Sequence, residues 1–460
     1  MSGEASPPLW TWPALCRALR LEARDGPDVT GIVIDSRKAG PGDLFIALTG
    51  DPGPRFNPSS RSDRDGHDFI DAAIAAGAAG VLAHDGAARD VPQLQVPDTL
   101  DGLWALGAAA RARLRCPVVA ITGSSGKTTT KGMLAAALGA FSTEGSLNNH
   151  LGVPLSLALS PADASAAVFE IGTNHPGEIA PLSVLVRPDV AVVLNVHPAH
   201  AENFVDLDEL RIEKLSINKG LEGKGHFVVE DGVAVHDLPS GLVLVRFGRR
   251  EGSDVRLLEV HGQTAAYRIG GERFTAHVPG GGEHRAASLA AVLAVLMALH
   301  RPVSDGLQLG DDLVPKGRGD ESLINGVTVV DDSYNANPES MKAALRTLSA
   351  ASGRTVAVLG DMLELGAEGP DHHRGLATHC RGIDRVYCVG EAMRELFDAL
   401  PEAQRAAWLP DAGGDSLIVA ILGELRSGDR ILIKGSNRVF WAAGFVGRFS
   451  ERLRTLTISE

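Results

Sequence analysis

The sequence predicts an α/β protein built from three domains, and three observations support this. Its 460 residues exceed one ordinary core and suit three domains of roughly 100–200 residues each. Short β-branched runs that end in polar residues alternate with helical stretches, which is typical of a parallel, doubly wound sheet. Abundant Gly and Ala, with only 5% aromatic residues, fit close packing of helices on strands.

The three domains are expected to differ in role. We predict a small α/β N-terminal domain over residues 1–108, a central P-loop-type parallel-sheet ATPase domain over 109–310, and a Rossmann-like α/β domain over 311–460. In the first, residues 31–48 predict a strand, a Pro-Gly turn and a second strand, and residues 68–84 predict a helix, a glycine stop and a strand.

The central domain begins with a predicted strand over 116–122, a Gly/Ser loop and a helix over 128–141. Further strands are expected over 166–172 and 189–196, each ending in polar residues. The segment 223–280 is Gly-punctuated, Val-rich and charged, which indicates a small antiparallel excursion.

The C-terminal domain follows a helix predicted over 284–299 and restarts the strand–helix pattern. Residues 327–338 predict a strand and a loop, and Pro338 can open a helix that runs to residue 350. Three more strands are expected over 354–362, 385–391 and 429–437.

Bulk composition excludes several classes of function. A net charge of −13 without a Lys/Arg block argues against a nucleic-acid partner. The N-terminus lacks the pattern of a signal peptide, and no apolar run reaches the roughly 20 residues that span a bilayer. Scattered cysteines argue against a disulfide framework or a zinc site and fit a reducing cytoplasm; they are Cys16, Cys116, Cys380 and Cys388.

The stretch VVAITGSSGKTTT, residues 118–130, predicts a phosphate-binding loop between a strand and a helix. Only two residues separate Gly123 from Gly126, whereas the common loop has four between its glycines. Consecutive N–H groups at a helix N-terminus can cradle a phosphate. Lys127 can neutralise phosphate oxygens and the Thr128 hydroxyl can bind Mg²⁺; the alternative is a Gly/Ser turn with a solvated lysine. The predicted ATP-binding residues here are Gly123, Ser124, Ser125, Gly126, Lys127, Thr128 and Thr129.

Metal-dependent phosphoryl transfer also needs ligands at the ends of neighbouring strands. Glu170 ends one predicted strand, His200 follows the next, and Lys214 lies in a predicted helix over 211–217. The alternatives are an acidic residue in a solvated turn, a polar loop histidine and a surface lysine. A histidine beside a metal-dependent loop is a plausible ligand or charge partner.

Several stretches resemble, in the same order, motifs of the Mur ligase family. They are TGSSGKTTT, SLNNHLGVPLSL, FEIGTNHPGEI, NVHPAHAENF with EKLSI, and DDSYNANPESM. The likeness covers nearly the whole chain, because the first domain contributes DSRKAGPGDLFIAL and DGHDFIDAAIAAGAAGVL. YNANPESM is the most diagnostic piece, and the short loop is shared by all Mur and folylpolyglutamate-type ligases.

This resemblance implies an ATP-dependent amide synthesis in peptidoglycan-precursor biosynthesis. The γ-phosphate goes to the terminal carboxylate of UDP-MurNAc-tripeptide, and the amine of D-Ala-D-Ala attacks the resulting acyl phosphate. The implied cofactors are ATP and two Mg²⁺ ions, and the implied protein is a cytoplasmic monomer without membrane insertion or nucleic acid.

Matching positions imply the catalytic and metal-binding residues. Thr128 and Glu170 match ligands of the first Mg²⁺, and His200 matches a ligand of the second. Lys214 matches the lysine that many members carbamylate, which turns an ammonium into an anion that helps to hold Mg²⁺. Glu213, its neighbour, is expected to point elsewhere on the helix. Lys127, Lys214 and His200 are therefore the predicted catalytic residues.

The resemblance also implies the binding residues. Asp332 resembles the acid that binds the ATP ribose, and Arg318 resembles the arginine that reaches the nucleotide from the third domain. The other nucleotide-binding residues implied are His284, Asn335 and Asn337. Those implied for the nucleotide-sugar peptide are Asn148, Asn149, Asn174 and His175, with Asp35, Ser36 and Arg37 for the uridine diphosphate. The dipeptide is expected at Lys434, Ser436 and Asn437.

Two departures from the family pattern leave alternatives open. The adenine-binding helix usually begins H-N-x-x-N, but here His284 stays while Arg285 and Ser288 replace both asparagines. Arginine can stack on a base, so altered ATP contacts, relaxed nucleotide choice or a role in another pathway all follow. An insertion over 50–66 lies in the domain expected to bind UDP. The alternatives are a Mur-like ligase with a different acceptor or amine, a simple kinase and a nucleotide-sensing scaffold without activity.

Overall fold

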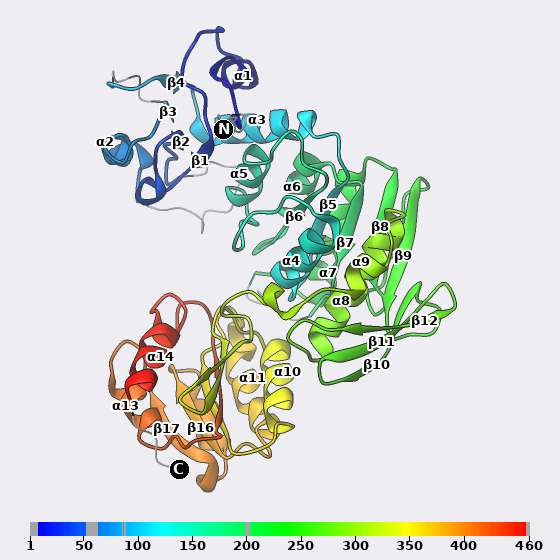
Figure 1. Ribbon diagram of the computed structural model, residues 1–460, viewed down its shortest axis with the longest axis vertical. Helices are drawn as coiled ribbons and strands as arrows, with labels where there is room; N and C mark the ends of the chain where they lie inside the picture. Colours follow the sequence, from blue (N-terminus) through cyan, green and yellow to red (C-terminus); the bar gives the residue numbers. More distant parts are fainter. Residues whose placement is uncertain (1–7, 52–62, 85, 87–88, 198–202, 457–460) are drawn as a thin grey trace, which may run out of the picture.

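The computed structural model describes residues 8–51, 63–84, 86, 89–197 and 203–456. Three separate sheets follow one another along the length of the molecule, and each carries its own helices (Figure 1). This confirms the predicted three-domain α/β class, whereas the boundaries at 108/109 and 310/311 stay predictions. No helix in the described ranges is long and apolar enough to cross a membrane.

The first sheet has four parallel strands in the order β1-β2-β3-β4. They are β1 (Gly31–Val33), β2 (Asp43–Ile46), β3 (Gly80–Ala83) and β4 (Gln93–Gln95). Three helices accompany it, α1 (Trp12–Ala18), α2 (Ile70–Ala75) and α3 (Thr99–Arg113). Asp98 caps α3 by accepting a hydrogen bond from the N–H of Asp101 at 2.9 Å.

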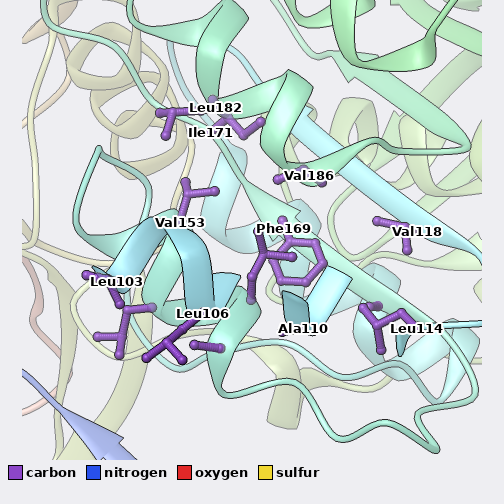
Figure 2. Packing of buried hydrophobic residues seen from close by; sticks show 14 of the residues in the cluster. Leu103, Leu106, Ala110, Leu114, Val118, Val153, Phe169, Ile171, Leu182 and Val186 are labelled. Atoms are coloured by element: carbon purple, nitrogen blue, oxygen red, sulfur yellow. The ribbon is translucent and has the colours of Figure 1, made fainter. Parts of the chain in front are cut away.

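Helix α3 runs through the predicted boundary at residue 108 and joins the first sheet to the central region. Figure 2 shows Leu106 of α3 in the same hydrophobic cluster as Phe169 of the central sheet. The indole Nε1 of Trp10 donates to the carbonyl of Ala158 at 2.8 Å, which adds a buried polar link. The first two sheets therefore share one continuous core.

The central sheet has eight strands in the order β12-β11-β10-β9-β8-β7-β5-β6. They are β5 (Val118–Thr122), β6 (Ala167–Glu170), β7 (Val190–Val193), β8 (Gly225–Glu230), β9 (Leu242–Gly248), β10 (Val255–His261), β11 (Thr264–Ile269) and β12 (Glu272–His277). Strands β10, β11 and β12 pair antiparallel, as expected within 223–280. The prediction is wrong for β8 and β9, because they pair parallel and extend the sheet from β7.

Helices cover both faces of the central sheet, and each face has its own hydrophobic cluster. Helices α4 (Lys127–Leu138) and α8 (Glu283–Ala298) contribute to one cluster, and α5 (Gly152–Ala158) and α6 (Ile179–Val186) to the other. Helices α7 (Leu207–Leu215) and α9 (Ser304–Leu307) complete the region. The carboxyl ends of β5, β6 and β7 meet at one sheet edge, where ligands of parallel sheets bind.

The C-terminal sheet has six strands in the order β13-β14-β18-β15-β16-β17, with only β13 antiparallel. They are β13 (Asp320–Ile324), β14 (Val327–Asp332), β15 (Thr355–Gly360), β16 (Arg385–Val389), β17 (Arg405–Leu409) and β18 (Arg430–Lys434). One face carries α10 (Pro338–Ser349), α11 (Gly369–Gly375) and α12 (Arg394–Ala399), and the other α13 (Ser416–Leu422) and α14 (Phe445–Thr455) (Figure 1). Pro338 opens α10, as predicted.

Candidate active site

The predicted phosphate loop lies between β5 and α4, and both of its glycines are sterically required. Gly126 has φ +79°, in the left-handed region that favours glycine. A Cβ at Gly123 would lie 2.9 Å from the Cβ of Leu194, closer than such atoms approach. Any larger residue at either position would displace the loop from the N-terminus of α4.

Asn195, which follows β7, holds the loop from the adjacent strand. Its Oδ1 accepts the N–H of Ser125 at 2.9 Å, and its carbonyl accepts the N–H of Ser124 at 3.2 Å. The Ser124 hydroxyl donates to the carbonyl of His197 at 2.9 Å and accepts its N–H at 3.0 Å. The sequence places Asn195 at the correct sheet edge, but only the structure shows that it orders the loop.

Lys127 lies folded over the loop. Its Nζ donates to the carbonyl of Gly123 at 2.7 Å. Burial lowers the pKa of Lys127, the charge of Glu170 counters this shift, and the charge of Arg318 adds to it. An anionic ligand at the loop would restore the stability of the ammonium, so the site favours a group such as phosphate.

Thr128 and Glu170, two of the predicted metal ligands, are in direct contact. The Thr128 hydroxyl donates to Oε2 of Glu170 at 2.9 Å, and both side chains are buried. Oε1 accepts the hydroxyl of Ser146 at 2.8 Å and the amide of Asn148 at 2.7 Å. Hydroxyl and carboxylate oxygens are the ligands that Mg²⁺ prefers, so these residues fit a shared magnesium ion.

Lys131 is a buried residue beside this carboxylate that the sequence analysis missed. Its Nζ donates to the carbonyls of Thr143 at 2.7 Å and Gly145 at 2.6 Å. It also lies 3.9 Å from Oε2 of Glu170. Lys131 therefore ties α4 to the segment that presents Ser146 to Glu170.

Lys214 is buried on α7, whose N-terminus Asp206 caps. Burial lowers its pKa well below the ordinary value, and the charge of Lys127 lowers it further. The neighbouring Glu213 points elsewhere, as predicted, because its carboxylate accepts the N–H groups of Gly177 at 2.8 Å and Ile179 at 2.7 Å. The burial of Lys214 favours the neutral amine.

We expect Glu213→Ala to lower the free energy of unfolding by about 3 kcal/mol, since two buried N–H groups lose a charged acceptor. Urea unfolding followed by circular dichroism measures this. Asp208→Ala is the control, because that carboxylate on the same helix is 66% exposed and its loss should change stability by less than about 1 kcal/mol. Equal effects of the two changes would contradict the assigned contacts.

A cleft of about 470 Å³, including its part open to solvent, lies between the start of α8 and the C-terminal sheet. It is lined by Gly280, Gly281, His284, Arg285, Gly319, Glu321, Val330, Asp332, Ala344, Thr347, Leu348, Arg430 and Leu432. Two predicted ATP-binding residues, His284 and Asp332, are therefore brought together. Burial lowers the pKa of His284 to about 4, so its ring is neutral at physiological pH.

Residues predicted for the ribose and the dipeptide adjoin one another. The Nζ of Lys434 donates to Oδ2 of Asp332 at 2.7 Å and to the carbonyl of Asn335 at 3.1 Å. Asn337 caps α10 by accepting the N–H of Ser340 at 2.9 Å. The Asp332–Lys434 pair thus connects the floor of the cleft with β18.

Arg318 lies with its guanidinium 4.2 Å from the ring centroid of Tyr334, a cation–π contact. Tyr334 in turn meets Trp441 edge to face at 5.3 Å between ring centroids. Ser436 accepts the N–H of Leu363 at 2.9 Å.

Asn437, also predicted for the dipeptide, accepts the N–H of Ala442 on its main-chain carbonyl at 2.9 Å.

A second cleft, of about 420 Å³ including its open part, lies at the carboxyl end of β6. It is lined by Asn148, Asn149, His150, Gly172, Thr173, Asn174, Glu178 and Leu182. Three residues predicted for the nucleotide-sugar peptide are among them. The fourth, His175, has its Nδ1 3.5 Å from Oε1 of Glu178.

The remaining predicted residues lie elsewhere. Asp35, Ser36 and Arg37 form an exposed turn after β1; Arg37 hydrogen-bonds to Asp35 at 2.7 Å and lowers the pKa of that carboxyl to about 2. His200, and residues 52–62 of the insertion, lie outside the described residues. In the described part of the chain, no group of three His, Cys, Asp or Glu residues is placed to hold a metal.

Comparisons with known proteins find the same relationship along most of the chain. Residues 121–296 match the Mur ligase middle domain, and residues 319–437 match the Mur ligase glutamate ligase domain. The UDP-N-acetylmuramoyl-tripeptide–D-alanyl-D-alanine ligase of Escherichia coli K12 is 36% identical over 399 residues, 81% of this chain and 84% of that protein. The corresponding protein of Bacillus subtilis is 31% identical and covers 89% of this chain.

Solved structures agree. MurF from Acinetobacter baumannii has a TM-score of 0.81 at 30% identity, covering 96% of this chain and 99% of that one. MurF from Thermotoga maritima in complex with ADP has a TM-score of 0.76 at 28% identity, covering 92% and 98%.

Proposed function

Because the chain belongs to the Mur ligase family, we propose that it joins D-alanyl-D-alanine to the terminal carboxylate of UDP-MurNAc-tripeptide, with ATP as the energy source. Curated relatives with this activity in their names align over most of both chains. The observation that carries the proposal is the buried contact between Thr128 and Glu170 beside the Lys127 loop. That contact combines a phosphate cradle and a metal site at one sheet edge.

The loop would bind the triphosphate and hold it for transfer. Phosphoryl transfer needs positioning and neutralisation of charge more than covalent chemistry. The N-terminus of α4 and the Lys127 ammonium supply both, and Asn195 keeps the loop in shape through Ser124 and Ser125. The base and ribose would occupy the 470 Å³ cleft at His284 and Asp332.

The acceptor carboxylate would reach the γ-phosphate from the second cleft. That cleft contains Asn148, whose amide also donates to Glu170, so the two sites share a residue. Transfer gives an acyl phosphate and ADP. The amine of D-Ala-D-Ala then attacks the acyl carbon, loses a proton and releases phosphate, with the dipeptide held near Lys434, Ser436 and Asn437.

Thr128 and Glu170 would hold one Mg²⁺, and His200 would hold a second. When bound, the ions neutralise the phosphate oxygens and stabilise the charge that develops in transfer. The buried contacts of Glu170 with Ser146 and Asn148 fix the carboxylate in place for this purpose.

Lys214 is proposed to be carbamylated. Burial and the nearby Lys127 charge disfavour its ammonium, and the neutral amine is the form that adds CO₂, losing one proton to give a carbamate anion. That anion would compensate the charge of Lys127 and help to hold the metal. We further propose a monomer that acts in the cytoplasm, where its nucleotide-linked substrates occur.

The test is phosphate release from ATP with purified protein and Mg²⁺. We expect release only when UDP-MurNAc-tripeptide and D-Ala-D-Ala are both present, with a mass gain of one dipeptide minus water in the product. L-Ala-L-Ala is the matched control amine. Equal release with other amines, or with a different acceptor, would favour the second candidate, a Mur-like ligase of another pathway, which the substitution of both family asparagines by Arg285 and Ser288 supports. No release in any combination would contradict both.

A further inference from the structure

Arg285 lies at the start of α8 with a side chain buried against two separate segments. Its exposed fraction is only 5%. One Nη donates to the carbonyl of Gly280, just before α8. The other donates to the carbonyls of Arg318 at 2.6 Å and Gly319 at 3.3 Å, on the segment that leads into the C-terminal sheet. One guanidinium therefore fastens the central region to the C-terminal region.

The two glycines around this guanidinium fit it closely. Gly280 and Gly319 have φ +69° and +84°, and a Cβ on either would lie 2.4 Å from an Nη of Arg285. Both positions thus need glycine for backbone conformation and for space. The pocket is shaped around an arginine fork, whose planar set of donors can serve several carbonyls at once.

The segment that Arg285 holds carries Arg318. The N–H of Gly319 donates to the carbonyl of Asp331 at 2.6 Å, which fixes the other side of the segment on β14. The Arg318 side chain lies over Tyr334 and near the phosphate loop, since its charge contributes to the lowered pKa of Lys127 after burial itself. Arg285 thus acts on Arg318 through the main chain.

We propose that Arg285 is a positioning residue that sets nucleotide affinity by holding the Arg318 segment against the start of α8. The proposal rests on the proposed function, because Arg318 must contact the nucleotide. Arg285 itself need not touch the base, since the four carbonyls of Gly280, Gly281, Arg318 and Gly319 engage its guanidinium.

A double-mutant cycle tests the coupling. Arg285→Met keeps the bulk of the side chain and removes the fork, and Arg318→Ala removes the proposed nucleotide contact. We expect Arg285→Met to weaken binding of the ATP analogue AMP-PNP with Mg²⁺ about tenfold by titration calorimetry, and to weaken it less than about twofold in the Arg318→Ala background. The KM for ATP should rise by a similar factor with little change in kcat.

Arg113→Met is the matched control. Arg113 is also a half-buried arginine that donates to carbonyls of two segments, Leu9 and Ser160, both at 2.9 Å. Its loss should lower the thermal midpoint and leave AMP-PNP affinity unchanged. Arg285→Lys should recover only part of the affinity, because a single ammonium cannot span both segments.

Additive effects of the Arg285 and Arg318 changes would overturn the proposal, since they would show that Arg285 meets the nucleotide by itself. Unchanged affinity in Arg285→Met would also overturn it. These outcomes are distinct from failure of the proposed function: a wild-type protein that binds AMP-PNP and releases no phosphate contradicts the ligase and leaves the cycle measurable.

Discussion

Lys127→Met is expected to reduce phosphate release about 10³-fold, equivalent to about 4 kcal/mol of lost transition-state stabilisation. The ammonium is the cation of the loop itself, held by the Gly123 carbonyl at 2.7 Å. Methionine retains the aliphatic bulk and removes only the charge. Steady-state phosphate release at saturating substrates measures the effect.

Stability should survive this change. Burial lowers the pKa of Lys127, so removal of its charge relieves a desolvation cost and the thermal midpoint should hold or rise. Lys131→Met is the control on the same helix, because that ammonium bonds the carbonyls of Thr143 and Gly145. Its loss should lower the midpoint and reduce turnover less. Turnover of Lys127→Met within tenfold of wild type would contradict the phosphate assignment.

Lys214→Ala is expected to lower turnover about 100-fold and to recover partly when acetate or formate is added. The reason is that a carbamate contributes an anion, and a short carboxylate can enter the space left by the side chain. The recovery should saturate with acid concentration in the phosphate-release assay. Mass spectrometry of the native protein, with and without added bicarbonate, checks for the extra CO₂.

The same acids serve as their own control on other proteins. They should not stimulate the wild type, nor Lys127→Met, whose defect is a missing cation. An Ala variant without rescue, together with a native protein of unmodified mass, would leave Lys214 as a buried neutral amine and sink the carbamate. Wild-type turnover should fall as pH falls, because protonation removes the neutral amine that reacts with CO₂.

The sequence predicted best where the chemistry is contiguous. The phosphate loop, Thr128 and the helix start at Pro338 depend on residues within a few positions of each other, and the structure places them as expected. Glu170 could be placed because the ends of parallel strands share one edge. The order of β8 and β9 could not be predicted, since Gly-rich, charged segments resemble hairpins while parallel pairing depends on the neighbouring strand.

Contacts to the main chain were beyond sequence reasoning. Lys131 and Arg285 bond carbonyl oxygens, which every residue possesses, so no residue type signals the partner. Arg285 was considered for stacking on a base, and the structure shows it bonded to carbonyls of two segments. Lys214 was expected to be free of a carboxylate partner, and the contacts of Glu213 with Gly177 and Ile179 agree with this.

Helix α3 has a consequence for how the molecule opens and shuts. Because it shares one hydrophobic cluster with the first two sheets, and Trp10 and Arg113 bond across the same joint, we expect those two sheets to travel as a single block. Rotation of the C-terminal body about the stretch near Gly319 would then account for most of the hinge motion. A fluorophore pair spanning the upper joint should report an unchanging separation on ATP addition, while one spanning the lower joint reports a shortening.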